Sequence, residues 1–418
     1  MTARDDLKGR LFREVDEGEV LDLLRRSVRT QSVTGQEASF ARLLEREMRA
    51  IGLDEVAAFD FAPDRPNVWG ALRGSGAGRR LMFAGHTDTV DVAGWGDRWR
   101  GTSREDPFSA AVEDGEVWGR GSADMKAGIV ASLCALAAVK RAGVPLKGDV
   151  LLAFVGDEES GIPGSGRSEG MKAIVRRIAD GAIPRPDFVV YTEPTTLDVY
   201  PAQMGFLIAD VTVTGRSAYF GLPWHGVDAL KAAHRLLTRL FEHSDEVWAR
   251  AHHPLLGRAF NLVTAIEGGG YIAVPETCRL SMIRKVLPGE TVEDARAELE
   301  GVVRLAAMNE GVRAEVAYPA GRDSAFGGRP AEVSADDESV RCLARAVREV
   351  TGKPDLIGGA PFWSEASFFV HGLGIPAVYC GAGDILHCHT FEERVRVREL
   401  IDAVKAFALM IADFCGGE

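Results

Sequence analysis

The stretch Leu81-Met82-Phe83-Ala84-Gly85-His86-Thr87-Asp88 decides the fold. Its apolar first half passes directly into polar residues, which is typical of a buried parallel strand with polar side chains at its carboxyl end. The same change follows Val150–Val155, where the chain continues as Gly156-Asp157-Glu158-Glu159, and Phe188–Tyr191, where it continues as Thr192-Glu193-Pro194. Ligands of open α/β sheets bind at the carboxyl ends of the strands, so we expect the three polar segments to share one crevice.

Helical patterns surround these strands. Residues 126–141 are apolar nearly all round and predict a buried helix that connects the first two strands, as in a βαβ unit. Further along, we expect a helix near 338–350, a strand at 377–380 and a terminal helix from about residue 397. These elements predict an α/β catalytic domain with a mixed, mainly parallel sheet flanked by helices.

The pattern changes at about Phe206 and indicates a second domain. Its expected elements follow the order βαββαβ of a split-βαβ, ferredoxin-like sandwich. They are a strand at 207–214, a helix that reaches residue 241, strands at 261–267 and 277–286, a helix that opens at Thr291, and a strand at 312–318. We therefore predict a lid and dimerisation domain at 206–318, inserted into a larger domain formed by 1–205 and 319–418. The Gly- and Pro-rich stretch 321–332 is interpreted as the return linker.

Length, composition and charge narrow the class of protein. A chain of 418 residues suggests about two to three domains, and 46% hydrophobic with 26% charged residues is typical of globular proteins. Lys+Arg 49 against Asp+Glu 61 gives a net charge of −12, which argues against nucleic acid and anionic membranes as partners. Because the charged start lacks an apolar leader and no long apolar run follows, we expect a cytoplasmic protein without a spanning helix. The six cysteines form no CxxC pair and are expected to be reduced thiols.

The polar segments contain groups that bind divalent cations. The candidates are His86, Asp88, Asp124, Glu158, Glu159, Glu193 and His389. Taken singly, each has an ordinary structural explanation, such as a helix N-cap for Asp124 or a solvated loop acid for Glu158. Together, two histidines and several carboxylates are a ligand set suited to Zn²⁺, Mn²⁺ or Co²⁺. A carboxylate can bridge two such ions about 3.5–4 Å apart, which would activate a water and polarise the group that it attacks, and a further carboxylate would take the water's proton.

Several segments, in this order, resemble the motifs of one metallohydrolase family. They are Gly85-His86-Thr87-Asp88, Gly119-Arg120-Gly121-Ser122-Ala123-Asp124-Met125-Lys126, Asp157-Glu158-Glu159-Ser160-Gly161, Glu193-Pro194-Thr195, Gly381-Ala382-Gly383 and His389-Thr390-Phe391-Glu392-Glu393. The chain is thereby similar to the metallopeptidase family of acetylornithine deacetylase, succinyl-diaminopimelate desuccinylase, aminoacylase and carboxypeptidase G. The resemblance covers nearly the whole chain, including the inserted lid.

The resemblance implies a set of metal ligands. His86 and Glu193 would hold one metal ion. Glu159 and His389 would hold a second ion, and Asp124 would bridge the two.

Two further acids receive catalytic roles from the same resemblance. Asp88 would accept the second ring N–H of His86, which fixes the tautomer of the ligand. Glu158 would be the general base that takes a proton from the metal-bound water and later delivers it to the departing nitrogen.

The lid departs from the family pattern at two positions. Where relatives have a histidine in a Gly-x-x-Ala-His-Ser-like segment, this chain has Tyr219, which can donate a hydrogen bond but cannot carry the charge of an imidazolium. His225 is a candidate replacement, and Ile272 stands where the family commonly has an asparagine. Arg284 resembles a basic lid residue that in relatives can meet a substrate carboxylate, and its alternative is a solvated charge at the end of a strand. Glu365 resembles a family position near the substrate and is a further candidate.

These residues predict a metal-dependent hydrolase with one or two divalent ions, in which a metal-bound hydroxide cleaves a C–N bond of a small carboxylate-bearing substrate. The first hypothesis is a deacylase or amidohydrolase acting on an N-acyl amino acid or a small peptide amide. The ring-rich lid favours an alternative, an aromatic amine aminohydrolase of the 5-nitroanthranilate type, which replaces an aryl amino group by hydroxyl and releases ammonia. A metal-dependent binding protein without turnover is a third hypothesis. The resemblance also implies a homodimer or higher homo-oligomer formed through the lid.

Overall fold

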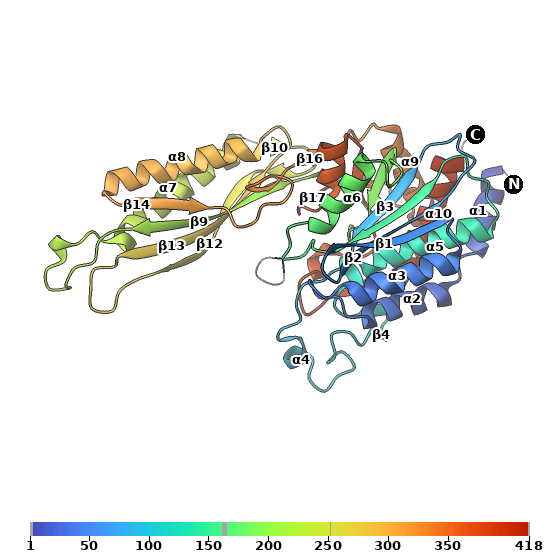
Figure 1. The fold of residues 1–418 in the computed structure, drawn as a ribbon, viewed down its shortest axis with the longest axis horizontal. Helices are drawn as coiled ribbons and strands as arrows, with labels where there is room; N and C mark the ends of the chain where they lie inside the picture. Colours follow the sequence, from blue (N-terminus) through green and yellow to red (C-terminus); the bar gives the residue numbers. More distant parts are fainter. Residues whose placement is uncertain (1–2, 161–164, 251, 417–418) are drawn as a thin grey trace. The chain divides into compact units, whose positions relative to one another are not determined.

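The computed structural model describes residues 3–160, 165–250 and 252–416, and it divides into two compact units (Figure 1). Unit 1 consists of Met1–Pro201, Val333–Gly359 and Phe368–Glu418. Unit 2 consists of Ala202–Glu332 and Ala360–Ser367. Each unit contains a β-sheet with helices packed against it.

Unit 1 is built on a mixed sheet whose centre is parallel. Its strands lie in the order β1 (Glu55–Ala62), β2 (Arg65–Leu72), β6 (Val150–Val155), β3 (Leu81–His86), β7 (Phe188–Tyr191) and β18 (Ala377–Tyr379). The strands from β6 to β18 run parallel, whereas β1 and β2 join antiparallel at one edge and β8 (Val199–Gln203) pairs antiparallel with β18. The three parallel strands predicted from the sequence are confirmed, and every residue of β3, β6 and β7 is buried.

Unit 1 also contains helices, several of which contact its sheet. They are α1 (Ala3–Arg13), α2 (Glu17–Arg29), α3 (Ala38–Ile51), α4 (Trp95–Arg98), α5 (Ala127–Arg141), α6 (Glu169–Ala179), α9 (Glu338–Thr351) and α10 (Val397–Gly416). α10 contacts both α5 and α9, and the buried rings of Phe83 in β3 and Phe407 in α10 lie 4.9 Å apart. The apolar segment Ser122–Arg141 is long enough to cross a membrane, but 89% of its most apolar window is buried inside the protein. The predicted buried helix is therefore present as a core helix.

Unit 1 also contains several short strands. β4 (Ala111–Glu113), β5 (Glu116–Trp118) and β19 (Arg394–Arg396) form a small sheet in the order β19-β5-β4, and β17 (Ile357–Ala360) pairs with β8. The cysteines of the chain are free, as the sequence predicts.

Unit 2 contains a five-stranded antiparallel sheet, and two helices pack against it. Along the chain it contains β9 (Gly205–Thr214), α7 (Ala229–Arg250), β12 (Phe260–Gly268), β13 (Thr277–Val286), α8 (Val292–Glu310) and β14 (Arg313–Ala317), with the strands in the order β12-β13-β9-β14. This is the predicted βαββαβ sequence of elements. Buried residues alternate along β9 and β13 and pack with α7 and α8 into one core. Shorter strands are β10 (His252–His253), β11 (Gly257–Arg258), β15 (Gly327–Gly328) and β16 (Ala331–Glu332).

The edges of unit 2 differ from the predicted boundaries. The unit starts at Ala202 and extends to Glu332, so the segment 321–332, interpreted above as a linker, belongs to unit 2. β15 pairs with β9, and a Cβ atom at Gly327 would lie 1.9 Å from the carbonyl oxygen of Phe206. Glycine is required here for close backbone approach rather than for a flexible connection.

Candidate metal centre

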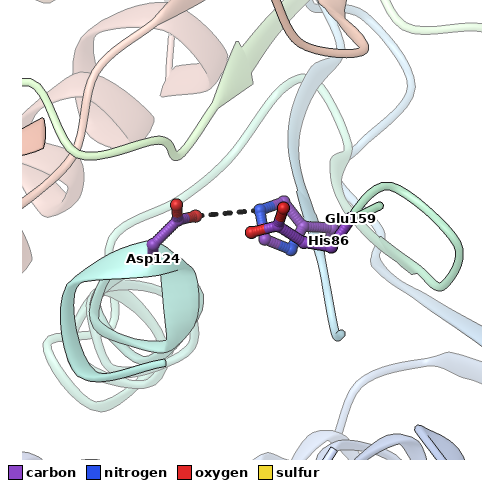
Figure 2. A group of neighbouring side chains, drawn as sticks. All are labelled: His86, Asp124 and Glu159. Atoms are coloured by element: carbon purple, nitrogen blue, oxygen red, sulfur yellow. Dashed lines mark hydrogen bonds and ion pairs between the residues drawn. The ribbon is translucent and has the colours of Figure 1, made fainter. Parts of the chain in front are cut away.

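Strand ends of unit 1 bring predicted ligands together. His86 is the last residue of β3, Glu159 follows β6 and Glu193 follows β7. Asp124 lies in the non-helical turn within Ser122–Lys126 that precedes α5. His86, Asp124 and Glu159 are buried and offer ligand atoms that all lie within 4.8 Å of one another (Figure 2). The strand order β6-β3-β7 explains this cluster, because the carboxyl ends of neighbouring parallel strands meet at one edge.

Asp124 faces both predicted histidine ligands. Its Oδ1 lies 3.0 Å from Nε2 of His86, and its Oδ2 lies 3.2 Å from Nε2 of His389. Oε1 of Glu193 lies 3.7 Å from the same nitrogen of His86, and Oε1 of Glu159 lies 2.9 Å from Nε2 of His389. The five side chains therefore form two histidine–glutamate pairs that share one aspartate. This arrangement suits a carboxylate that bridges two cations.

The electrostatics of these side chains favour positive charge. Burial disfavours a charged imidazole at His86, but Glu193 and Asp124 outweigh it and raise its pKa well above the usual value. Burial also opposes charge on His389, yet Asp124 and Glu159 raise its pKa to about 11. Burial alone would raise the pKa of Asp124, whereas its contacts with the two histidines hold it far below the usual range. The nitrogen and oxygen donors of this set fit Zn²⁺, Mn²⁺ or Co²⁺.

Asp88 holds the loop that follows β6. Its Oδ2 accepts the amide of Glu159 at 2.9 Å, and its Oδ1 accepts the amide of Glu158 at 3.3 Å. Nδ1 of His86 lies 3.0 Å from the backbone carbonyl oxygen of Asp88 and 3.9 Å from its Oδ1. The predicted contact is therefore corrected: the backbone carbonyl takes the place of the carboxylate, which binds the two amides instead. Burial raises the pKa of Asp88 to about 7, although His86 opposes this shift.

Glu158 is more accessible than the acids beside it. Its side chain is partly exposed, whereas those of Asp157 and Glu159 are buried. Asp157 adopts a left-handed φ of 76°, and its carboxylate pairs with Arg65 at 3.0 Å, which anchors the start of the loop. A water-accessible carboxylate next to a buried carboxylate of the cluster suits proton transfer. Gly161, the last residue of this motif, lies outside the described residues.

The four predicted substrate residues belong to unit 2. Tyr219 and His225 are exposed in the loop between β9 and α7, and Glu365 is buried. Arg284 in β13 is also buried, and its guanidinium donates to Glu290 at 2.7 Å. The structure does not support the expectation that Arg284 meets a substrate carboxylate, because this side chain is an internal ion-pair partner.

Two residues near the centre were not predicted. Oγ1 of Thr34 donates to the backbone carbonyl of Glu159 at 3.2 Å, and Glu393 accepts the amide of Asp124 at 3.1 Å. Thr34 gives no sequence signal, since it lies outside every motif. Glu393 had a signal that was not used: it stands four residues after His389 in the same motif.

Metal binding to the chelator-treated protein is expected to release protons and to tighten as pH rises from about 6 to 9. His86 and His389 bind protons more tightly than ordinary imidazoles because their pKa values are raised, whereas metal ligation requires neutral imidazole. Calorimetric titration with Zn²⁺ in two buffers of different ionisation enthalpy measures the proton release, which should approach about two per chain near neutral pH. Affinity that does not change with pH, without proton release, would contradict the assignment of these histidines as ligands.

Comparisons with known proteins agree with the motifs. The profile of Peptidase family M20/M25/M40 matches residues 82–413. Acetylornithine deacetylase of Myxococcus xanthus is 30% identical to this chain over 363 residues, which are 86% of each protein. Succinyl-diaminopimelate desuccinylase of Gluconacetobacter diazotrophicus is 35% identical over 227 residues, which are 53% of this chain and 54% of that protein.

The fold is also present among solved structures. The di-peptidase Dug1p from Saccharomyces cerevisiae superposes with a TM-score of 0.77 at 13% identity, over 97% of this chain and 98% of that chain. The family match runs from β3 to α10 and so includes all five clustered side chains. The chain therefore belongs to peptidase family M20/M25/M40 and is a metal-dependent hydrolase that acts on C–N bonds.

Proposed function

We propose that this protein is a deacylase that hydrolyses the amide of an N-acyl amino acid or of a small peptide. The observation that carries the proposal is Asp124, which faces two histidine–glutamate pairs and leaves Glu158 accessible beside them. The names of the two curated relatives support the same substrate class, because a deacetylase and a desuccinylase each release an acyl group.

Two divalent ions would be held by the clustered side chains. One ion would bind His86 and Glu193, the other would bind Glu159 and His389, and Asp124 would contact both. When bound, such ions supply Lewis acidity, which polarises a carbonyl oxygen and makes water acidic near neutral pH. The donor set admits Zn²⁺, Mn²⁺ and Co²⁺ alike.

Glu158 moves the proton in the proposed reaction. Its carboxylate takes a proton from water as the water oxygen attacks the carbonyl carbon. The C–N bond then breaks, and Glu158 delivers this proton to the departing nitrogen, so that a carboxylic acid and an amine result. The amide hydrogen bonds to Asp88 hold the base in a fixed position relative to the neighbouring ligand Glu159.

An aromatic substrate is a second candidate, which the loops of unit 2 favour. Tyr219, Phe220 and Trp224 have exposed fractions of 63%, 57% and 70%, and that of Tyr271 is 99%. A backbone bridge between Tyr219 and Ala273 joins the two loops that carry these rings. Exposed rings of this kind suit contact with another aromatic ring. An enzyme that replaces an aryl amino group by hydroxyl needs rings of this kind to bind its substrate.

A mixed substrate panel separates these candidates. We expect the Zn²⁺- or Mn²⁺-loaded protein to release free amino acid from N-acetyl and N-succinyl amino acids, and to release little ammonia from amino-substituted nitrobenzoates. Chromatography of the products together with an ammonia assay provides the readout. Ammonia and a hydroxylated ring from the nitrobenzoates alone would replace the deacylase by an aryl aminohydrolase. Saturable binding without turnover of any compound would instead favour a metal-dependent binding protein.

Glu158→Gln is expected to lower kcat by about 10²–10⁴-fold while the metal content per chain stays constant. The substitution removes the base but none of the clustered ligands. Glu338→Gln is the matched control, because this glutamate lies in the first turn of α9 with its side chain 76% exposed. Steady-state kinetics and elemental analysis provide the two readouts. A wild-type kcat would remove Glu158 from the proton path, and a loss of metal would make it a ligand.

We also propose that unit 2 joins two copies of the chain. β12 is the edge strand of its sheet, and it exposes Leu262 and Ile266. α7 contacts β12 and exposes Phe241 and Trp248, which are seven residues apart and so lie on one face of the helix. An exposed edge strand beside an apolar helix face is a template for pairing with a second copy.

The double variant Leu262→Lys, Ile266→Lys is expected to convert a dimer into a monomer in sedimentation equilibrium, because charges on an edge strand oppose strand pairing. Met308→Lys on α8 is the control: its side chain is 72% exposed, and the variant should keep the mass of the wild-type protein. A wild-type protein that sediments as a single chain, or a dimer that survives the double variant, would contradict the proposed interface.

A further inference from the structure

Glu393 is a buried carboxylate that touches the metal centre through the backbone. It lies four residues after His389, and its side chain is fully buried. Oε1 accepts the amide of Ala123 at 3.2 Å and the amide of Asp124 at 3.1 Å. Oε2 accepts from Nη1 of Arg120 at 2.6 Å. One carboxylate thus binds three donors of the segment that carries the shared aspartate.

The backbones of the two segments are paired as well. β19 and β5 are antiparallel neighbours, with Arg394 opposite Trp118. The amide of Gly119 donates to the backbone carbonyl of Glu393 at 3.2 Å. Side-chain and main-chain contacts therefore fasten the segment of Asp124 to the segment of His389, although Ala123 and Glu393 are 270 positions apart.

The backbone amide of Asp124 needs a hydrogen-bond acceptor from outside the adjoining helix α5. Its φ of −116° and ψ of 95° are not helical, and it lies in the turn before α5. The first amides at the start of a helix have no acceptor within that helix. A charged acceptor forms a stronger hydrogen bond than a neutral one. With its amide held by Glu393, the Asp124 backbone is fixed in the orientation that directs one carboxylate oxygen to each histidine.

We propose that Glu393 is a positioning residue of the metal centre, which fixes Asp124 through two amide hydrogen bonds and links it to His389 on its own segment. Arg120 completes the arrangement, since a buried carboxylate without a cationic partner is strongly unfavourable. A glutamine at position 393 would fit the same space. Its NH₂ group, however, would face either Arg120 or the two backbone amides, which are donors and need an acceptor. The inference rests on the metal-binding roles of Asp124 and His389 in the proposed function and does not depend on the substrate.

Glu393→Gln tests this inference in the full chain. The chelator-treated protein is titrated with Co²⁺, calorimetry gives the affinity, and visible absorption reports the coordination of the ion. We expect the affinity for at least one Co²⁺ to fall by about 10–100-fold, which is typical when a partner behind a metal ligand is removed. Glu392→Gln is the matched control and should bind as the wild type does, because this adjacent glutamate is partly exposed and pairs with Arg98.

The melting temperature of the metal-free protein separates positioning from a general structural role. If Glu393→Gln lowers only this temperature, and Co²⁺ affinity and spectrum match those of Glu392→Gln, the proposal is overturned. If Glu393→Gln fails to fold, Arg120→Lys serves instead: it keeps the charge but loses the planar fork of the guanidinium. We expect Arg120→Lys to weaken Co²⁺ binding in the same direction, and wild-type affinity would overturn the proposal.

The outcomes for this inference and for the proposed function are distinguishable. A wild-type chain that binds no Co²⁺ overturns the inference together with the metal centre. A chain that binds Co²⁺ but hydrolyses no compound of the panel overturns only the proposed function.

Discussion

The position of Asp124 between two imidazoles is the interaction on which the site depends. Its two oxygens face His86 and His389, and each histidine is also approached by a glutamate. Three carboxylates lie close together in a buried place, and their negative charge is stable only beside positive charge. The same carboxylates raise the pKa of both histidines, so the imidazoles favour the positively charged form. The clustered donors therefore suit cations, and the sheet, loops and helix that surround them keep the acids close together.

Buried acids around the ligands act as hydrogen-bond acceptors for the backbone. Asp88 accepts the amides of Glu158 and Glu159, and Glu393 accepts those of Ala123 and Asp124. In both cases a carboxylate next to the site fixes the main chain of a residue that the chemistry needs. Preorganisation of this kind is effective because amide groups held in place do not have to reorganise during the reaction. Two groups of carboxylates can thus be distinguished here: Asp124, Glu159 and Glu193 face the histidines, whereas Asp88 and Glu393 bind backbone amides beside them.

The sequence predicts the parts of the structure that depend on local pattern. The buried strands β3, β6 and β7 and the polar residues at their ends are visible because apolar runs stop abruptly, and His86, Glu159 and Glu193 are candidates from these positions. The metal-binding roles of Asp124 and His389 come from the family resemblance. Contacts between distant segments are not encoded in such a pattern. The carboxylate of Asp88 could turn toward the ring of His86 or toward the next loop, and only the packing decides this. Arg284 reads as an exposed strand residue until Glu290 is placed beside it, and Gly327 reads as part of a linker until its approach to β9 is known.

The division of unit 2 into two stretches of chain limits how this protein can be recombined with its relatives. Besides 202–332, the unit takes up the short stretch 360–367. The rings of Phe206 and Trp363 lie 5.5 Å apart, and Nε1 of Trp363 donates to the carbonyl of Arg329 at 3.1 Å, so the two stretches are matched to each other. A chimaera that takes only residues 202–332 from a relative would pack foreign side chains against the original Trp363. Grafting this unit from a relative therefore requires both stretches to be transferred together, because each supplies contacts that the other needs.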